Sequence, residues 1–243
     1  DRPVYWQCAV SIPTRHTAPV TSVMFYHYPD KTRLDRVVAK QKVLAHVKGS
    51  NKLRERFRDE VEQITWHAKI APSTLNIPGT KDVPELQVFV INLKGEVLHD
   101  EVLSAIDHAI PFPIVFELQG PSGVCVKAAY KRPNQADANK WVTDDSYLSS
   151  GWHAEDIERH PLPPAIHLKA LYHQWLSEMI PTPKRVGECL EEQLARFSAA
   201  SALEKQAEKL EKRLRNTKQF NRRVELNAEL RGIREQITEY IAR

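Results

Sequence analysis

The segment from Val83 to Leu93 constrains the fold most, because large apolar residues occupy both of its alternating faces. The alternation sorts them into two sets: Phe89, Ile91 and Leu93 on one face, and Leu86, Val88 and Val90 on the other. A strand that left either set in water would lose the hydrophobic free energy of that whole face. The sequence therefore predicts a central strand that packed elements cover on both sides of its sheet.

A helix and a strand are predicted before this segment. Spacings of three and four residues predict a helix after an N-cap at Ser50 or Asn51, with its apolar stripe at Leu53, Phe57, Val61 and Ile64. Over residues 64–70 the apolar residues alternate with polar ones, which is typical of a half-buried strand. Residues 72–84 are expected to form a loop.

A short helix and a hairpin are predicted after it. Asp100 is the expected cap of the helix, and Pro111 is expected to end it, since the residue before a proline leaves the helical region. Apolar runs at 114–118 and 124–130 flank the turn-forming residues 119–123, which contain Pro and Gly. We therefore expect two strands that are joined by an expanded hairpin loop.

The remaining patterns before the C-terminal part complete an α+β domain over residues 25–182. A further strand is expected within residues 147–152. Residues 168–179 predict an amphipathic helix that packs on the sheet, with apolar positions at Leu168, Leu171, Tyr172, Trp175 and Met179. The sheet is expected to be mixed or mostly antiparallel, and residues 1–24, which show no clear period, are expected to form a leader outside it.

Residues 186–243 predict a helical coiled-coil arm. Two apolar seams repeat at intervals of three and four residues: Leu203, Ala207, Leu210, Leu214 and Thr217 in the first, and Leu226, Leu230, Ile233, Ile237 and Tyr240 in the second. The two seams are out of register across residues 216–223. Either one long helix drifts in phase there or the chain folds back as a hairpin, and the sequence leaves both open.

Positive charge is concentrated in this arm. The whole chain has 35 Lys and Arg against 31 Asp and Glu, a formal net charge of +4, yet residues 212–223 hold six cations and no carboxylate. Such a segment is typical of contact with a phosphate backbone or an acidic partner. The candidate binding residues are Lys212, Arg213, Arg215, Lys218, Gln219, Arg222 and Arg223. The alternative is a solvated helix face whose cations pair with Glu204, Glu208, Glu211 and Glu225.

A divergent metal-dependent nuclease is the competing hypothesis. Its candidate catalytic residues are Glu62, expected on a helix, with Lys69, Glu85, Gln87 and Lys127 on strands. Carboxylates would hold Mg²⁺ and a lysine would orient the attacking water. The fit is poor, because Gln87 stands where the motif needs Lys and residues 124–130 contain no acid. We expect no metal site and no cofactor, with Mg²⁺ required only under this hypothesis.

Other classes of protein are excluded on composition and motif. The three cysteines are far apart, which excludes a disulfide framework and favours a reducing cytoplasm. No P-loop or dinucleotide fingerprint occurs, and the histidines lack the spacing of metal ligands. No apolar run approaches the roughly 20 residues that a membrane-spanning helix needs.

Five ordered blocks carry a resemblance to a known family. They read EQITWHAKIAPSTLNIP at 62–78, VPELQVF at 83–89, IDHAIPFPIVF at 106–116, AAYKR at 128–132 and KQFNRRVELN at 218–227. On these blocks the chain resembles domain-of-unknown-function family 4391. The resemblance implies a prokaryotic protein encoded beside DNA methyltransferases and helicases of restriction or phage-defence type, with no established activity. It makes six residues the first to test: Lys69, Glu85, Gln87, Tyr130, Lys131 and Arg132.

We therefore expect a non-catalytic accessory component of a DNA-modification or antiviral-defence assembly. Its protein partner would be a helicase or methyltransferase, and the basic arm, with Tyr130, Lys131 and Arg132, would bind that partner or DNA. Two alternatives stay open at this point. They are the nuclease and a structural protein that forms homo-oligomers through its coiled-coil arm.

Overall fold

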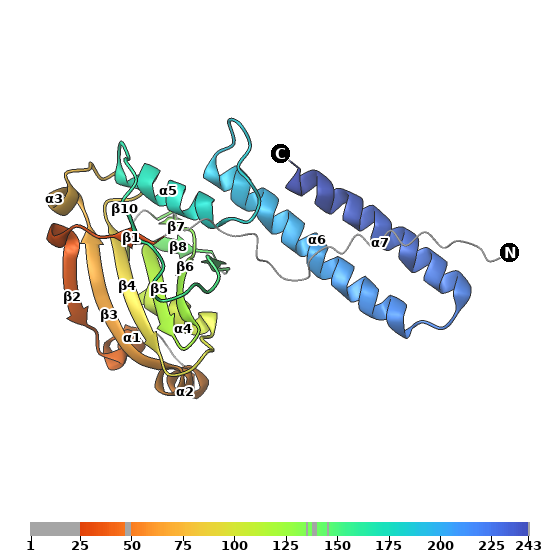
Figure 1. Cartoon of the computed structure of the whole chain (residues 1–243), viewed down its shortest axis with the longest axis horizontal. Helices are drawn as coiled ribbons and strands as arrows, with labels where there is room; N and C mark the ends of the chain where they lie inside the picture. Colours follow the sequence, from red (N-terminus) through yellow and green to blue (C-terminus); the bar gives the residue numbers. More distant parts are fainter. Residues whose placement is uncertain (1–24, 47–49, 135, 138–139, 145, 243) are drawn as a thin grey trace.

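The computed structural model describes residues 25–46, 50–134, 136–137, 140–144 and 146–242, so the expected leader at 1–24 lies outside the described residues. A six-stranded sheet lies at its centre (Figure 1). The strands follow the order β2 (Arg33–Val37), β3 (Val61–Ile70), β4 (Leu86–Leu93), β5 (Ile114–Gly120), β6 (Gly123–Ala128) and β9 (Leu148–Ser149). Neighbours are antiparallel except β4 and β5, which confirms an α+β fold with a mixed, mostly antiparallel sheet.

Strand β4 lies inside this sheet and is covered on both faces, as predicted. Phe89 and Ile91 pack in one core cluster, with α1 (Lys40–His46), α2 (Asn51–Asp59) and α4 (Asp100–Ala109). Leu86 and Val88 pack in a second cluster on the other face, under α5 (Leu168–Met179). Each layer removes one apolar face of the strand from water.

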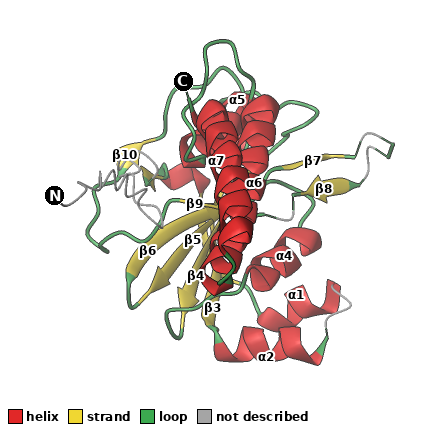
Figure 2. Ribbon diagram, turned by 90° about the vertical axis from the view of Figure 1, so that its right-hand side faces the viewer, coloured by secondary structure: helices red, strands yellow, loops and turns green. Residues whose placement is uncertain are grey.

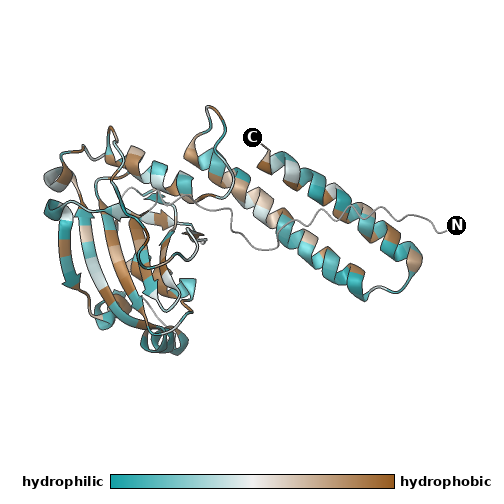
Figure 3. Cartoon of the chain, viewed as in Figure 1, coloured by the Kyte–Doolittle hydropathy of each residue, from teal (hydrophilic) through white to brown (hydrophobic). Residues whose placement is uncertain are grey.

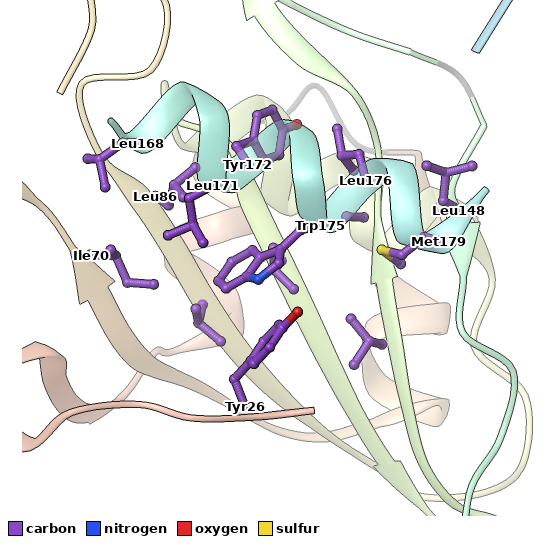
Figure 4. Packing of buried hydrophobic residues seen from close by; sticks show 14 of the residues in the cluster. Tyr26, Ile70, Leu86, Leu148, Leu168, Leu171, Tyr172, Trp175, Leu176 and Met179 are labelled. Atoms are coloured by element: carbon purple, nitrogen blue, oxygen red, sulfur yellow. The ribbon is translucent and has the colours of Figure 1, made fainter. Parts of the chain in front are cut away.

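Helix α5 covers its face of the sheet with a row of buried side chains (Figure 4). Trp175 stacks on Tyr26, with ring centroids 5.3 Å apart and planes 18° from parallel. Tyr26 belongs to β1 (Tyr26–His27), which pairs in parallel with β10 (His160–Pro161). The helix ends at Met179, where Ile180 turns to an extended conformation before Pro181.

The helix expected up to Ile64 is shorter than predicted. Ser50 caps α2 by accepting a hydrogen bond from the Leu53 amide at 3.3 Å, but α2 ends at Asp59 and β3 begins at Val61. A register shift between Val61 and Gln63 lets Val61 and Ile64, three residues apart, both reach the core. Because of this bulge, the buried residues of the strand have a three-residue spacing that also occurs in helices.

Other boundaries also differ from the prediction. His99 and not Asp100 is the N-cap of α4, and the expected loop after β3 contains the short helix α3 (Pro72–Leu75). The β5–β6 loop is tight, because Gly120 pairs with Gly123, whose φ of 104° suits glycine. The strand expected within residues 147–152 is shorter than predicted and consists of β9, Leu148–Ser149. Three short elements complete this part of the chain: η2 (Asp30–Thr32), β7 (Lys131–Pro133) and β8 (Trp141–Thr143).

The arm is a helical hairpin, which settles the alternative that the sequence left open. Helix α6 (Leu190–Asn216) ends where Thr217 becomes extended, and α7 (Phe220–Ile241) returns beside it (Figures 1 and 2). The two predicted seams face each other in a third apolar cluster that contains Ala207, Leu210, Leu226, Leu230 and Ile233. Apart from this seam the hairpin is largely hydrophilic (Figure 3).

Polar contacts attach the base of the hairpin to the sheet domain. Gln193 is fully buried, accepts a hydrogen bond from Ser177 at 2.6 Å and donates one to the Thr182 carbonyl at 3.0 Å. Arg196 pairs with Glu188 at 2.7 Å and donates to the carbonyl of Tyr240 near the end of α7. One guanidinium therefore joins the beginning of α6 to the end of α7.

The ion pair at this base makes stability depend on pH. Hydrogen bonding from Arg196 lowers the pKa of Glu188 from 4.5 to about 2. A carboxyl group whose pKa is lower in the folded state stabilises the fold above its unfolded pKa, and this contribution is lost as pH falls from about 4.5 towards 2. We expect Glu188→Gln to flatten the fall in melting temperature over that range. Glu229→Gln, at an exposed position on α7, is the control and should leave the profile unchanged.

A buried hydroxyl gives a second prediction. Tyr172 accepts a hydrogen bond from the Lys131 amide at 2.9 Å and donates one to the Ala129 carbonyl at 2.8 Å. Tyr172→Phe leaves both buried groups without a partner, so we expect a loss of about 1–3 kcal/mol in urea unfolding. Tyr240→Phe, where the residue is 38% exposed, should cost almost nothing. Equal costs would contradict this assignment.

Candidate functional site

The tip of the helical hairpin collects the basic segment that the sequence singles out. Residues 212–223 cover the last turn of α6, the connection and the first turn of α7, at the end of the arm farthest from the sheet (Figure 1). All six cations there are exposed. Of these six cations, only Arg222 forms an ion pair with a described residue, and its partner is Glu225 at 2.5 Å. We call residues 212–223 the basic tip.

Apolar side chains and a free helix end add to the basic tip. Phe220 is 76% exposed, and Val224, one turn later on the same side of α7, is 53% exposed. Gln219, the N-cap of α7, makes no side-chain capping bond. The first amides of α7 therefore face solvent beside the cations, where the helix dipole adds positive potential.

Under the alternative of a solvated helix face, four carboxylates would pair with the cations of the basic tip, but among the residues that it describes the structure shows only one such pair. Glu225 pairs with Arg222, but Glu211 pairs with Arg234 on the stem of the hairpin, at 2.8 Å. Glu204 and Glu208 precede the tip by one or more turns of α6. Lys212, Arg213, Arg215, Lys218 and Arg223 thus keep a positive charge that no described carboxylate contacts.

Three of the five nuclease candidates lie together at one end of β3 and β4. Lys69 pairs with Glu85 at 2.6 Å, and Gln87 donates a hydrogen bond to the same carboxylate at 2.8 Å. Trp66 donates its indole N–H to the side-chain amide oxygen (Oε1) of Gln87 at 2.7 Å. These contacts form one continuous polar chain, in which each group orients the next.

The other two candidates lie elsewhere. Glu62 belongs to β3 and not to a helix, seven residues from Lys69 and so about 23 Å along the strand. Lys127 on β6 pairs with Asp100 at 2.7 Å. Within the described residues, no group of three His, Cys, Asp or Glu side chains could hold a metal ion. The structure thus does not bring the five candidates to one centre.

Lys131, which the sequence predicts as a binding residue, lies inside the protein. Its side chain is 2% exposed, and its ammonium donates to the carbonyls of Asp107 and Ile110, both at 2.5 Å, at the C-terminal end of α4. Burial lowers the pKa of Lys131 and raises the pKa of Asp107, whose carboxylate lies 3.5 Å away. A buried ammonium with these partners is out of reach of a phosphate.

Of its two neighbours, Tyr130 is also buried and Arg132 is partly exposed. Tyr130 is 8% exposed and donates to Glu191 at 2.7 Å, which joins the sheet domain to the first turn of α6. Burial raises the pKa of the Tyr130 hydroxyl. Arg132, on the short strand β7, is partly exposed.

A polar cleft of about 400 Å³ on the α5 side of the sheet was missed by sequence reasoning. In it Arg159 holds Glu117 through both carboxylate oxygens, at 3.2 and 2.8 Å, and His67 contacts Asp35 at 2.6 Å. The bond with His67 lowers the pKa of Asp35, whose φ of 47° is left-handed. These residues come from four separate segments, so no spacing in the sequence could have linked them.

The fold and the basic tip together define a protein with an α+β body and a helical hairpin that carries a cationic end. The chain belongs to the family described as Domain of unknown function (DUF4391), whose model matches residues 27–237. Comparison with curated proteins and with solved structures gives no match. None of the helices that the structure describes is both long and apolar enough to cross a membrane.

The buried Lys131 gives a prediction that separates an internal role from a binding role. Lys131→Met leaves the Asp107 carboxylate buried without its cation, and we expect the free energy of unfolding to fall by about 3–5 kcal/mol. Arg132→Met, at the next and partly exposed residue, should cost less than about 1 kcal/mol. Chemical denaturation of both variants measures the difference, and an undiminished stability of Lys131→Met would refute the internal role.

Proposed function

We propose that this protein is a non-catalytic accessory component of a prokaryotic DNA-modification or phage-defence assembly, acting in the cytoplasm. Its helical arm binds a protein partner, and the basic tip of that arm binds the phosphate backbone of nucleic acid. The observation that carries the proposal is the set of exposed cations at the basic tip, among which carboxylates are almost absent. The assembly and its helicase or methyltransferase come from the family resemblance alone.

The shape of the arm supports this role. Helix α6 has 27 residues, so the basic tip lies about 40 Å from the beginning of that helix. Cations at such a distance from the body can approach a backbone without a clash between the nucleic acid and the sheet domain. Each phosphate that they neutralise releases a condensed counterion, which is the main source of sequence-independent affinity.

The hairpin seam favours binding over self-association through the arm. Leu210, Leu226 and Leu230 are at most 5% exposed within a single chain, because α6 and α7 cover each other's apolar stripe. A coiled coil between two chains on this seam would first have to separate α6 from α7. Binding through the exposed cations of the basic tip requires no separation of the two helices.

Neutralising the basic tip tests the proposal. We expect replacement of its six cations by Gln to weaken the binding of a short DNA and to flatten the dependence of affinity on salt. Each lost phosphate contact removes roughly 0.7–0.9 from the slope of log K against log salt. Gel-shift titrations at several salt concentrations measure both effects, for variants at Lys212, Arg213, Arg215, Lys218, Arg222 and Arg223.

A matched pair of triple variants controls for net charge. One carries Gln at Lys212, Arg213 and Arg215 in the basic tip, and the other carries Gln at three exposed cations of the stem, Lys205, Lys209 and Arg231. Both lose three charges, but only the tip variant should lose affinity and slope. Equal losses of affinity in the two triple variants would show that DNA responds to the net charge of the arm and not to a site at the basic tip. Undiminished binding by the six-fold variant would refute the proposal.

A further inference from the structure

A second cleft, of about 300 Å³, opens on the face of the sheet opposite α5. It lies between α1 and the C-terminal end of α4, and none of its lining residues belongs to the basic tip. The wall on the α4 side contains Ala109 and Ile110, and the ammonium of Lys131 holds the Ile110 carbonyl in place. The cleft is thus part of the packed body, with one wall fixed by a buried hydrogen bond.

The floor of this cleft contains a pair of stacked aromatic rings. Trp66 on β3 stacks on Phe89 on β4, with ring planes 4° apart and centroids 6.3 Å apart. Phe89 is 3% exposed, and Trp66 is partly exposed. A planar ligand on the partly exposed Trp66 would extend this stack, and both stacking and loss of water favour it.

A single amide provides a directional group at the floor. Gln87 lines the cleft although it is only 2% exposed, and its orientation is set by Trp66 at one end and Glu85 at the other. A carboxamide nitrogen has two N–H groups, and the hydrogen bonds that the structure describes use one of them. The second can donate to a carbonyl or ring nitrogen of a ligand.

The rim of the cleft carries one cation and one imidazole. Lys42 and His46 lie one turn apart on α1, and both are exposed and line the cleft. The carboxylate that also lines it, Glu85, is already paired with Lys69 at 2.6 Å. An anion at the rim therefore meets the ammonium of Lys42 and the imidazole of His46 with the nearby negative charge neutralised.

We propose that this cleft binds a planar heteroaromatic ring that carries an anionic group, the chemical class of a mononucleotide. The ring stacks on Trp66 and accepts a hydrogen bond from Gln87, while the phosphate lies at Lys42 and His46. The site is independent of nucleic-acid binding by the basic tip. Either can be present without the other.

Three probes separate the parts of the ligand. We expect AMP to bind the full-length protein saturably in isothermal titration calorimetry. Adenosine, which lacks the phosphate, should bind at least several-fold more weakly, and ribose 5-phosphate, which lacks the ring, should show no saturable heat. Absence of saturable AMP binding at millimolar concentration would overturn the proposal, as would equal binding of AMP and ribose 5-phosphate.

A variant that fills the cleft tests its location. Ala109 is partly exposed in the cleft wall, so Ala109→Phe occupies the space of the ring without inserting volume into the core. The matched control is Ala45→Phe, at an exposed position of α1 that does not line the cleft. We expect AMP binding to be lost in the first variant and retained in the second. Retention in both would place the ligand elsewhere and refute the site.

The rim is tested by the double variant Lys42→Gln and His46→Gln. We expect it to bind AMP no more tightly than the unaltered protein binds adenosine, and to leave adenosine binding unchanged. Lys52→Gln, at an exposed cation of α2 outside the cleft, is the charge control and should change neither ligand. Equal weakening of both ligands by the rim variant would contradict the assignment of the phosphate to Lys42 and His46.

Discussion

The two-sided burial of β4 is the constraint on which the other elements of this protein depend. Because β4 and β5 run parallel, the chain must cross over between them, and α4 makes that crossover while it covers Phe89 and Ile91. The opposite face then needs a separate cover, which α5 provides over Leu86 and Val88. The cleft beside α4 and the attachment of the hairpin to α5 are both consequences of where these two helices lie.

Much of this arrangement could be predicted from the chain, because periodicity reports burial directly. The two apolar faces of β4, the cap at Ser50 and the end of α5 before Pro181 are properties of a few neighbouring residues. The spacing of Val61 and Ile64 predicts a helix, but a bulge in β3 gives a strand the same spacing. Only pairing with a partner strand, which is distant in sequence, distinguishes a bulged strand from a helix here.

The sites were harder to predict, because charge in a sequence does not reveal burial. Lys131 and Arg132 are adjacent cations, yet Lys131 is enclosed by the end of α4 while Arg132 reaches the surface. The basic tip was visible because twelve consecutive positions lack a carboxylate. The cleft that contains Asp35, His67 and Arg159 combines distant segments, and only the folded chain brings them together.

The base of the hairpin has a mechanical consequence. Arg196 and Arg185 bind carbonyls at the end of α7, and Gln193 binds the segment before α6, so both helices are held at one end of the arm and free at the other. Such an arm behaves as a lever clamped at its base. A rotation of about 6° there moves the end of an arm of about 40 Å by about 4 Å. The buried contacts around Gln193 and Arg196 therefore determine where the far end of the arm points.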